Sequence, residues 1–306
     1  MYQKGWLKQR RLKAPVISVG NLTVGGTGKT PMVIWLAEQF LADGKRVAIL
    51  SRGYRGLSGT SDEIELMGNR IGNRVVFGVG KDRFAAGTQL ESERPIDVFL
   101  LDDGYQHLSL ARDLNILMLD GSVKLKDEWL LPAGVLREPI SACCRADILI
   151  VTRKTERPDI EARDSHKFSI IYAQTRLRGF RLAGNQEVPN YLSEIGPGPF
   201  FAFCGIGNSE AFWSDLARWH VVLAGRNAFR DHHRYTKGDV RKLEEAADQS
   251  GAKAFITTEK DEQNLEQARL FKRPVYVAVI DFVLSSESEF LAAIDRVLSR
   301  RHGAAA

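Results

Sequence analysis

The sequence predicts an α/β protein with a first domain built on a parallel sheet and a second, smaller α/β domain. Three observations support this prediction. Apolar runs alternate with amphipathic helical patterns along most of the 306 residues. A glycine-rich turn joins the first run to the first helix. Residues 168–184 interrupt the alternation with a pattern typical of a two-stranded hairpin. We therefore expect the first domain at residues 1–153, and the hairpin with the second domain at residues 154–306.

The first apolar run and the turn after it predict a nucleotide-binding site. Residues 16–19 form a short β-branched strand, and residues 23–31 then read TVGGTGKTP. A strand, glycine loop and helix make the phosphate-binding loop of P-loop NTPases, where backbone N–H groups and a lysine hold phosphates and a threonine ligates Mg²⁺. The alternative is a glycine-rich turn with an incidental GKT. We expect ATP to contact Thr23, Gly25, Gly26, Thr27, Gly28, Lys29 and Thr30.

This loop departs from the standard pattern at one position. Thr23 stands where G-x-x-x-x-G-K-[ST] requires the first glycine. The core GGTGKT is closer to the variant loop of the ParA/MinD class, although Val24 replaces the lysine that opens that variant. The strand before the loop and the helix after it still favour nucleotide binding.

The remaining elements are expected in chain order. After a helix that ends before Gly44, strands are predicted at residues 46–50, 75–79, 97–101, 114–119 and 148–151, with a short helix at 84–90. The second half repeats the alternation. Strands are predicted at residues 200–204, 221–223, 254–257 and 275–280, and helices at 210–219, from a Thr236–Asp239 capping box to 248, and at 288–298.

Composition excludes several classes of protein. The chain is 44% hydrophobic and 26% charged, as in ordinary globular proteins. It has no apolar run long enough to span a bilayer and no apolar signal-peptide region. Its cysteines, Cys143, Cys144 and Cys204, lack metal-ligand spacing. We therefore expect a cytoplasmic protein without a structural metal.

The net charge of +5 is unevenly distributed. Residues 1–13 contain basic side chains and no acid, and Tyr2 and Trp6 lie among them. This pattern suits an anionic membrane surface, and a solvated terminus is the alternative. No nucleic-acid-binding signature accompanies it, so we expect no nucleic-acid partner.

Acidic residues follow the strand at residues 97–101. Asp102 and Asp103 stand where a phosphate-loop site places the acid on its Mg²⁺ side. A second polar segment, LPAGVLREP at residues 131–139, carries Arg137 beside Glu138 between prolines. Because this loop is constrained, we expect Arg137 to contact the transferred phosphate.

The segments GNLTVGGTGKTP, SRGY, DDGYQH, LLPAG with LREP, CGIGN, DHH and TEKD together resemble the tetraacyldisaccharide 4'-kinase family along nearly the whole chain. The resemblance implies two α/β domains joined by a two-stranded linker. It also implies transfer of the ATP γ-phosphoryl group to the 4'-hydroxyl of tetraacyldisaccharide 1-phosphate. The product would be lipid IVA, made during lipid A (lipopolysaccharide) biosynthesis by a peripheral enzyme at the cytoplasmic face of the bacterial inner membrane.

The resemblance also implies roles for particular residues. Asp62, in SDE where the family has GDEP, would be the general base paired with His232, and Arg137 would assist catalysis. The expected metal ligands are Thr30, Asp102, Asp103 and Glu138.

Several alternatives remain open at this stage. His232 and His233 could instead bind a metal or have a structural role, and the roles of His107 and Lys260 are undecided. The other functions considered are a ParA/MinD-like membrane-associated ATPase switch and a kinase of another glycolipid.

Overall fold

The computed structural model describes residues 8–53, 62–123, 125–153, 168–185, 190–265 and 270–303. The chain divides into two compact units. Unit 1 comprises residues 1–55, 70–174 and 282–306, and unit 2 comprises residues 56–69 and 175–281. The sequence analysis expected one boundary between residues 153 and 154, whereas each unit combines separate stretches of the chain.

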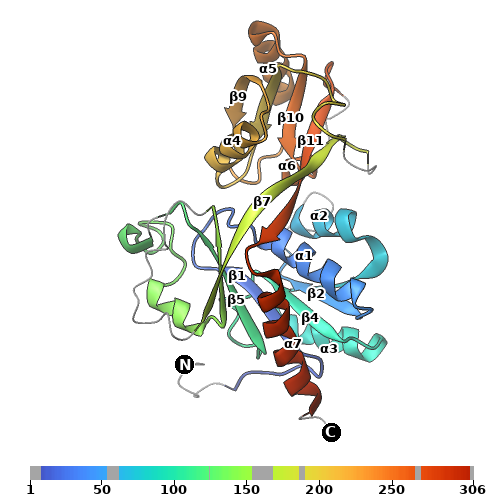
Figure 1. Ribbon diagram of the computed structural model, residues 1–306, viewed down its shortest axis with the longest axis vertical. Helices are drawn as coiled ribbons and strands as arrows, with labels where there is room; N and C mark the ends of the chain where they lie inside the picture. Colours follow the sequence, from blue (N-terminus) through green and yellow to red (C-terminus); the bar gives the residue numbers. More distant parts are fainter. Residues whose placement is uncertain are drawn as a thin grey trace. The chain divides into compact units, whose positions relative to one another are not determined.

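Unit 1 is built on a parallel sheet (Figure 1). Its strand order is β3-β2-β4-β1-β5-β6-β7. The strands are β1 (Val16–Asn21), β2 (Val47–Ser51), β3 (Val76–Val79), β4 (Val98–Asp102), β5 (Leu114–Asp120), β6 (Ile148–Thr152) and β7 (Ser169–Leu182). Every residue of β1, β2, β4 and β6 is buried. This explains why the sequence shows continuous apolar runs, since helices and loops cover both faces of such a sheet.

Three helices of unit 1 pack on this sheet: α1 (Lys29–Ala42), α3 (Arg83–Glu93) and α7 (Glu287–Gly303). The ring centroids of Trp35 in α1 and Phe290 in α7 are 5.7 Å apart. The C-terminal helix therefore packs against α1, the helix that follows β1 (Figure 1). Leu90 of α3 packs in a separate buried cluster with Phe99 of β4. The predicted stop of α1 is confirmed, because Gly44 has a left-handed φ of 72° just after the helix.

Shorter elements connect these parts. They are α2 (Asp62–Ile71), which the sequence analysis did not predict, and the 3₁₀ turns η2 (Gly72–Arg74), η3 (Leu125–Asp127) and η4 (Ile140–Arg145). The helix α2 begins in the stretch assigned to unit 2.

Unit 2 is the smaller α/β unit, with strand order β7-β11-β10-β8-β9. Its elements are β8 (Phe200–Cys204), α4 (Ser209–Arg218), β9 (Leu223–Ala228), α5 (Lys237–Ser250), β10 (Ala254–Thr258), α6 (Glu259–Glu262) and β11 (Val275–Leu284). Aromatic rings fill part of its core, with Phe203 between Tyr235 and Phe255 at 5.2 and 5.9 Å. The predicted capping box is confirmed: Thr236 and Asp239 bond reciprocally at the start of α5.

The predicted hairpin at residues 168–184 is wrong. This stretch is the single strand β7, which runs without a turn through Gly179. Its neighbours come from distant sequence: β6, which pairs with it in parallel, and β11. Bonds from Ser285 N to Tyr172 O and from Ala183 N to Val275 O show that β7 and β11 run in opposite directions. The two-stranded linker therefore consists of β7 and β11, both of which pass from one unit to the other.

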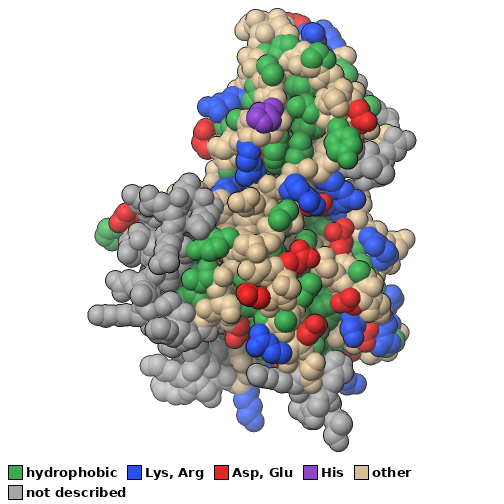
Figure 2. Space-filling model, viewed as in Figure 1, with side chains coloured by type: hydrophobic (Ala, Val, Ile, Leu, Met, Phe, Trp, Pro, Cys, Tyr) green, Lys and Arg blue, Asp and Glu red, His purple; other side chains and the backbone are tan. Residues whose placement is uncertain are grey.

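The surface of unit 1 mixes charges of both signs. On the face seen in Figure 2, acidic and basic side chains are interspersed. Within the N-terminal basic segment, Arg10 pairs with Asp82 at 2.7 Å and Arg11 with Asp113 at 2.6 Å. Residues 1–7, including Tyr2 and Trp6, lie outside the described residues. No helix in the described part of the chain is both long and apolar enough to cross a membrane.

Candidate active site

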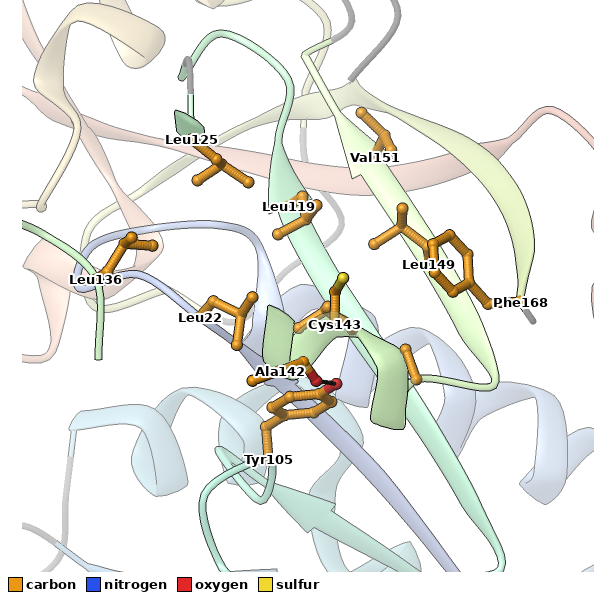
Figure 3. Close-up of a cluster of buried hydrophobic side chains, with 12 residues drawn as sticks. Leu22, Tyr105, Leu119, Leu125, Leu136, Ala142, Cys143, Leu149, Val151 and Phe168 are labelled. Atoms are coloured by element: carbon orange, nitrogen blue, oxygen red, sulfur yellow. Dashed lines mark hydrogen bonds between the residues drawn. The ribbon is translucent and has the colours of Figure 1, made fainter. Parts of the chain in front are cut away.

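Three segments of unit 1 meet where β1 and β4 end. They are the phosphate-binding loop, the turn after β4, and the loop before η4. Each contributes one side chain to the same buried cluster: Leu22, Tyr105 and Leu136 (Figure 3). The Tyr105 hydroxyl donates to the carbonyl oxygen of Ala142 at 2.7 Å, drawn as the dashed line in Figure 3. This cluster holds the three polar segments in a fixed arrangement, because packed cores resist small displacements.

Backbone hydrogen bonds join the same segments. Gly104 N donates to Val19 O at 3.1 Å, Arg137 N to Leu22 O at 2.7 Å, and Val24 N to Val135 O at 2.8 Å. Thr23, expected among the nucleotide contacts, is 7% exposed and forms an isolated antiparallel bridge with Leu136. The side chain of Thr23 is thus largely covered by protein, and its backbone ties the phosphate-binding loop to the loop that carries Arg137.

Two glycines of the phosphate-binding loop have backbone conformations that other residues rarely adopt. Gly25 has φ 112°, and Gly28, the N-cap of α1, has φ 89°. A Cβ atom at Gly28 would also lie 2.6 Å from the Phe282 ring. The glycine pattern that predicted a phosphate site is therefore required by the local fold as well.

Lys29, Asp103 and Arg137 form a charged cluster in unit 1. Lys29 Nζ lies 3.5 Å from Asp103 Oδ1, and Arg137 Nη1 donates to Asp103 Oδ1 at 2.9 Å and Oδ2 at 2.7 Å. Burial by itself would raise the pKa of Asp103, but Lys29 and Arg137 outweigh it and lower this pKa. Asp103 has φ 48°, a strained value for a residue other than glycine. Such strain is characteristic of residues held in place for a function.

The other two expected acids have different surroundings. Asp102, the last residue of β4, is 2% exposed and stands opposite Val19 of β1 in the parallel register. Glu138 accepts a hydrogen bond from Arg145 Nη2 at 2.8 Å, and this arginine also lies 4.5 Å from the centre of the Tyr105 ring. In this structure Glu138 is thus engaged by Arg145, whereas Asp103 faces the lysine of the phosphate-binding loop.

The donor set suits a phosphate-bound magnesium ion. Mg²⁺ in such sites takes one or two protein ligands and completes its shell with water and phosphate oxygens. Thr30 in the first turn of α1, with Asp102 and Asp103 at the end of β4, provides oxygens of this kind. The described residues contain no group of three or more His, Cys, Asp or Glu side chains that could hold a metal by themselves. The hydroxyl of Thr27 is buried without a partner among the described residues, as expected for a group that meets a ligand.

A second polar cluster lies entirely within unit 2. His232 Nδ1 is 3.0 Å from Asp62 Oδ2, and Asn264 Nδ2 donates to the same oxygen at 2.7 Å. The hydrogen bond with His232 is the main cause that lowers the pKa of Asp62 to about 2, and the same bond raises the pKa of His232. The predicted pairing of Asp62 with His232 is therefore present in the geometry.

Two further side chains complete this cluster. Lys260 Nζ lies 3.2 Å from His232 Nε2 and donates to Asp231 Oδ1 at 2.8 Å. A lysine can only donate, so Nε2 acts as the acceptor when this contact forms, and the imidazole proton then sits on Nδ1, facing Asp62. Sequence reasoning left Lys260 undecided and missed Asn264, for which the chain carries no local signal.

Two other histidines, His233 and His107, have structural surroundings. His233 Nε2 lies 3.2 Å from Asp239 Oδ2, and its ring stacks on Phe229 at 4.4 Å. His107 lies 3.2 Å from the Ser109 hydroxyl, and burial followed by the charge of Arg83 lowers its pKa to about 4. These contacts favour support of the local turns over ligand binding.

The comparisons with known proteins agree with this geometry. The family described as Tetraacyldisaccharide-1-P 4'-kinase matches residues 1–299. The tetraacyldisaccharide 4'-kinase of Geobacter metallireducens is 39% identical over 97% of this chain and 92% of its own length. That of Geobacter sulfurreducens is 40% identical over 97% and 88%. The crystal structure of LpxK from Aquifex aeolicus in complex with ATP is 30% identical, with a TM-score of 0.73, and the match covers 97% of this chain and 92% of that one. This chain therefore belongs to the tetraacyldisaccharide-1-P 4'-kinase family.

Proposed function

We propose that this protein transfers the γ-phosphoryl group of ATP to the 4'-hydroxyl of tetraacyldisaccharide 1-phosphate, giving the lipid IVA precursor of lipid A. The observation that carries the proposal is the family match over residues 1–299 together with the charged cluster at the phosphate-binding loop. The alternative function, a ParA/MinD-like ATPase switch, is disfavoured, because this chain matches two tetraacyldisaccharide 4'-kinases over 92% and 88% of their own lengths.

In the proposed site, Lys29 and the backbone of residues 25–30 hold the nucleotide phosphates. Bound ATP would supply the phosphoryl group, and Mg²⁺ would neutralise part of the charge on its phosphates. The proposed ligands of the metal are Thr30, Asp102 and Asp103. Glu138 remains a further proposed ligand of the metal. Arg137 is held by Asp103 and adds positive charge where negative charge develops on the transferred group. Phosphoryl transfer depends chiefly on such positioning and neutralisation.

Asp62 is the proposed general base. With its pKa near 2, it is ionised across the physiological range and can accept a hydrogen bond from the sugar hydroxyl. A weak base suffices, because phosphoryl transfer through a loose transition state depends mainly on positioning and charge neutralisation. His232 holds the carboxylate in place through Nδ1 and supports its charge.

A direct assay tests this proposal. We would measure transfer of labelled γ-phosphate from Mg-ATP to purified tetraacyldisaccharide 1-phosphate in mixed micelles. Asp62→Asn is expected to lose about 10²–10⁴-fold in turnover while still binding ATP. Glu210→Gln, at a carboxylate of the same unit whose side chain is 77% exposed, is the matched control and should keep full activity. Absence of label on the lipid with the wild-type protein would refute the assignment of the acceptor.

We also propose that the protein works at the cytoplasmic face of the inner membrane, where a lipid substrate of this class would be met. The support is the basic segment at residues 1–13 with its two aromatic residues. Arg10 and Arg11 are engaged in ion pairs, so the contact would rely on Lys4, Lys8 and Lys13. Sedimentation with anionic vesicles should weaken when residues 1–7 are deleted, and equal sedimentation would contradict this placement.

A further inference from the structure

Arg153 lies at the carboxyl-terminal ends of the strands of the unit 1 sheet, where the phosphate-binding loop follows β1. It follows β6 directly, and the parallel register aligns Thr152 of β6 with Asp120 of β5. The strand β5 pairs in turn with β1, which leads into the loop. The carboxyl ends of β1, β5 and β6 therefore lie side by side, on the opposite flank of β1 from β4 and Asp103.

The guanidinium of Arg153 joins this edge to the loop. Its Nη1 donates to Asp120 Oδ2 at 2.7 Å and to the carbonyl oxygen of Gly26 at 3.1 Å. Asp120 is itself fixed, because it is 7% exposed and its Oδ1 accepts from the backbone and hydroxyl of Ser122 at 3.0 and 2.6 Å. The aspartate thus anchors the arginine, and the arginine contacts the phosphate-binding loop.

The backbone of Arg153 is held in an unfavourable conformation. Its φ is 51°, in the left-handed region that residues other than glycine rarely occupy. Its Nε atom is buried and has no partner within the described ranges of the chain. Strain of this kind persists only where surrounding contacts impose it, and it is concentrated at functional sites.

The contact with Gly26 controls the direction of a neighbouring amide. The carbonyl of Gly26 and the N–H of Thr27 belong to one planar peptide group and point in opposite directions. In this structure the Thr27 N–H donates to Gly25 O at 3.1 Å, so both ends of the peptide are held. Fixing the carbonyl from outside restricts where the amide can point, and inward amides are what a phosphate-binding loop offers its ligand.

We infer that Arg153, anchored by Asp120, is a positioning residue for nucleotide binding, which orients the Gly26–Thr27 peptide and adds positive charge beside the bound phosphates. The inference rests on the proposed function as an ATP-dependent kinase. It assigns to the proposed nucleotide site of unit 1 a further cationic side chain besides Lys29 and Arg137, one that contacts the phosphate-binding loop from its β5–β6 side.

The test compares ATP binding by the full-length wild type with that of Arg153→Gln, Arg153→Lys and Asp120→Asn. The dissociation constant for Mg-ATP is measured by calorimetry, together with kcat and the separate KM values for ATP and lipid. The control is Arg11→Gln, which breaks the 2.6 Å ion pair with Asp113 elsewhere in unit 1. Thermal unfolding without nucleotide reports whether each variant is folded.

We expect Arg153→Gln to weaken ATP binding by about tenfold to a hundredfold and to raise KM for ATP similarly, because a charge-assisted contact is lost. The KM for lipid should stay unchanged. Arg153→Lys should recover part of the affinity, and Asp120→Asn should weaken binding even if Arg153→Gln does not fold. Arg11→Gln should bind as the wild type does.

Wild-type ATP affinity in folded Arg153→Gln, or in Asp120→Asn when Arg153→Gln is unfolded, would overturn the inference. A loss of stability with unchanged affinity would have the same meaning, since it would make Arg153 purely structural. Failure of the wild type itself to bind ATP would instead refute the proposed function. The two failures are thus distinguished by the wild-type measurement.

Discussion

Asp62 and His232 lie 170 positions apart in the chain, yet His232 Nδ1 is 3.0 Å from Asp62 Oδ2 within unit 2. Two local features support this contact. Asp62 is the first residue of α2, and His232 has a left-handed φ of 55°. Because strain of this kind must be stabilised by the surrounding contacts, the pair is a feature that the fold maintains.

The first prediction concerns the hydrogen bond from Asn264 to Asp62. Asn264→Ala should lower kcat by about tenfold and leave KM for ATP unchanged, because a hydrogen bond to a charged group is lost beside the proposed base. Asn264 keeps its backbone bonds to Asp261 and Tyr235, so the local fold should survive. The matched control is Gln263→Ala at the preceding position. Unchanged kcat in folded Asn264→Ala would show that Asp62 needs no such support.

The second prediction concerns the titration of His232. Its pKa should lie above the ordinary 6.5, because the protonated imidazole is stabilised by Asp62. The raised pKa also sets how folding stability depends on pH. The stability that the Asp62–His232 pair contributes is fully present below pH 6.5 and is lost as the pH rises through the raised pKa of His232. NMR titration of the imidazole should show the raised value in the wild type and a lower one in Asp62→Asn. A pKa that does not change on this substitution would argue against the pairing in solution.

The third prediction tests the geometry of Arg137. Arg137→Ala should reduce kcat/KM for ATP by about a hundredfold, because both the charge beside the transferred group and one of the two cationic partners of Asp103 are removed. Arg137→Lys should recover only part of this loss, since an ammonium cannot reproduce the planar guanidinium. Exposed Arg94, at the end of α3, offers the control Arg94→Ala. Full recovery by lysine would show that charge alone matters.

The fourth prediction concerns the stability of unit 2. The Tyr235 hydroxyl donates to Asp261 Oδ1 at 2.8 Å, and burial raises the pKa of this carboxyl. Tyr235→Phe should destabilise the protein by about 1–3 kcal/mol, because a buried carboxyl loses a donor. Tyr191→Phe, at a residue that is 72% exposed, should leave the melting temperature unchanged. Equal melting temperatures for both variants in thermal unfolding would contradict the prediction.

Much of the fold could be predicted from local patterns. The buried parallel strands appear as apolar runs, and β8 has the predicted bounds. The phosphate-binding loop is identifiable because its glycines and lysine are adjacent in sequence, and the left-handed angles at Gly25 and Gly28 agree with that identification. The alternation of apolar and polar residues shows that a stretch is extended but not which strands it pairs with. The sequence therefore predicted a hairpin where the structure has the single strand β7. The helix α2 was also missed: three acids at its start mark the segment as polar, although Ile64, Met67 and Ile71 recur at helical spacing and are buried.

By itself, the sequence determined the α/β class and the phosphate-binding loop. Through the family resemblance it also pointed to Asp62, His232 and Arg137 as candidate site residues. Only the tertiary structure decided which of these side chains meet and what else surrounds them. Asn264 reaches Asp62 across 202 positions, and Arg153 reaches Gly26 across 127. The physical reason is that helices and strands follow from local periodicity. Contacts between distant side chains depend on sheet order and register, which many residues determine together.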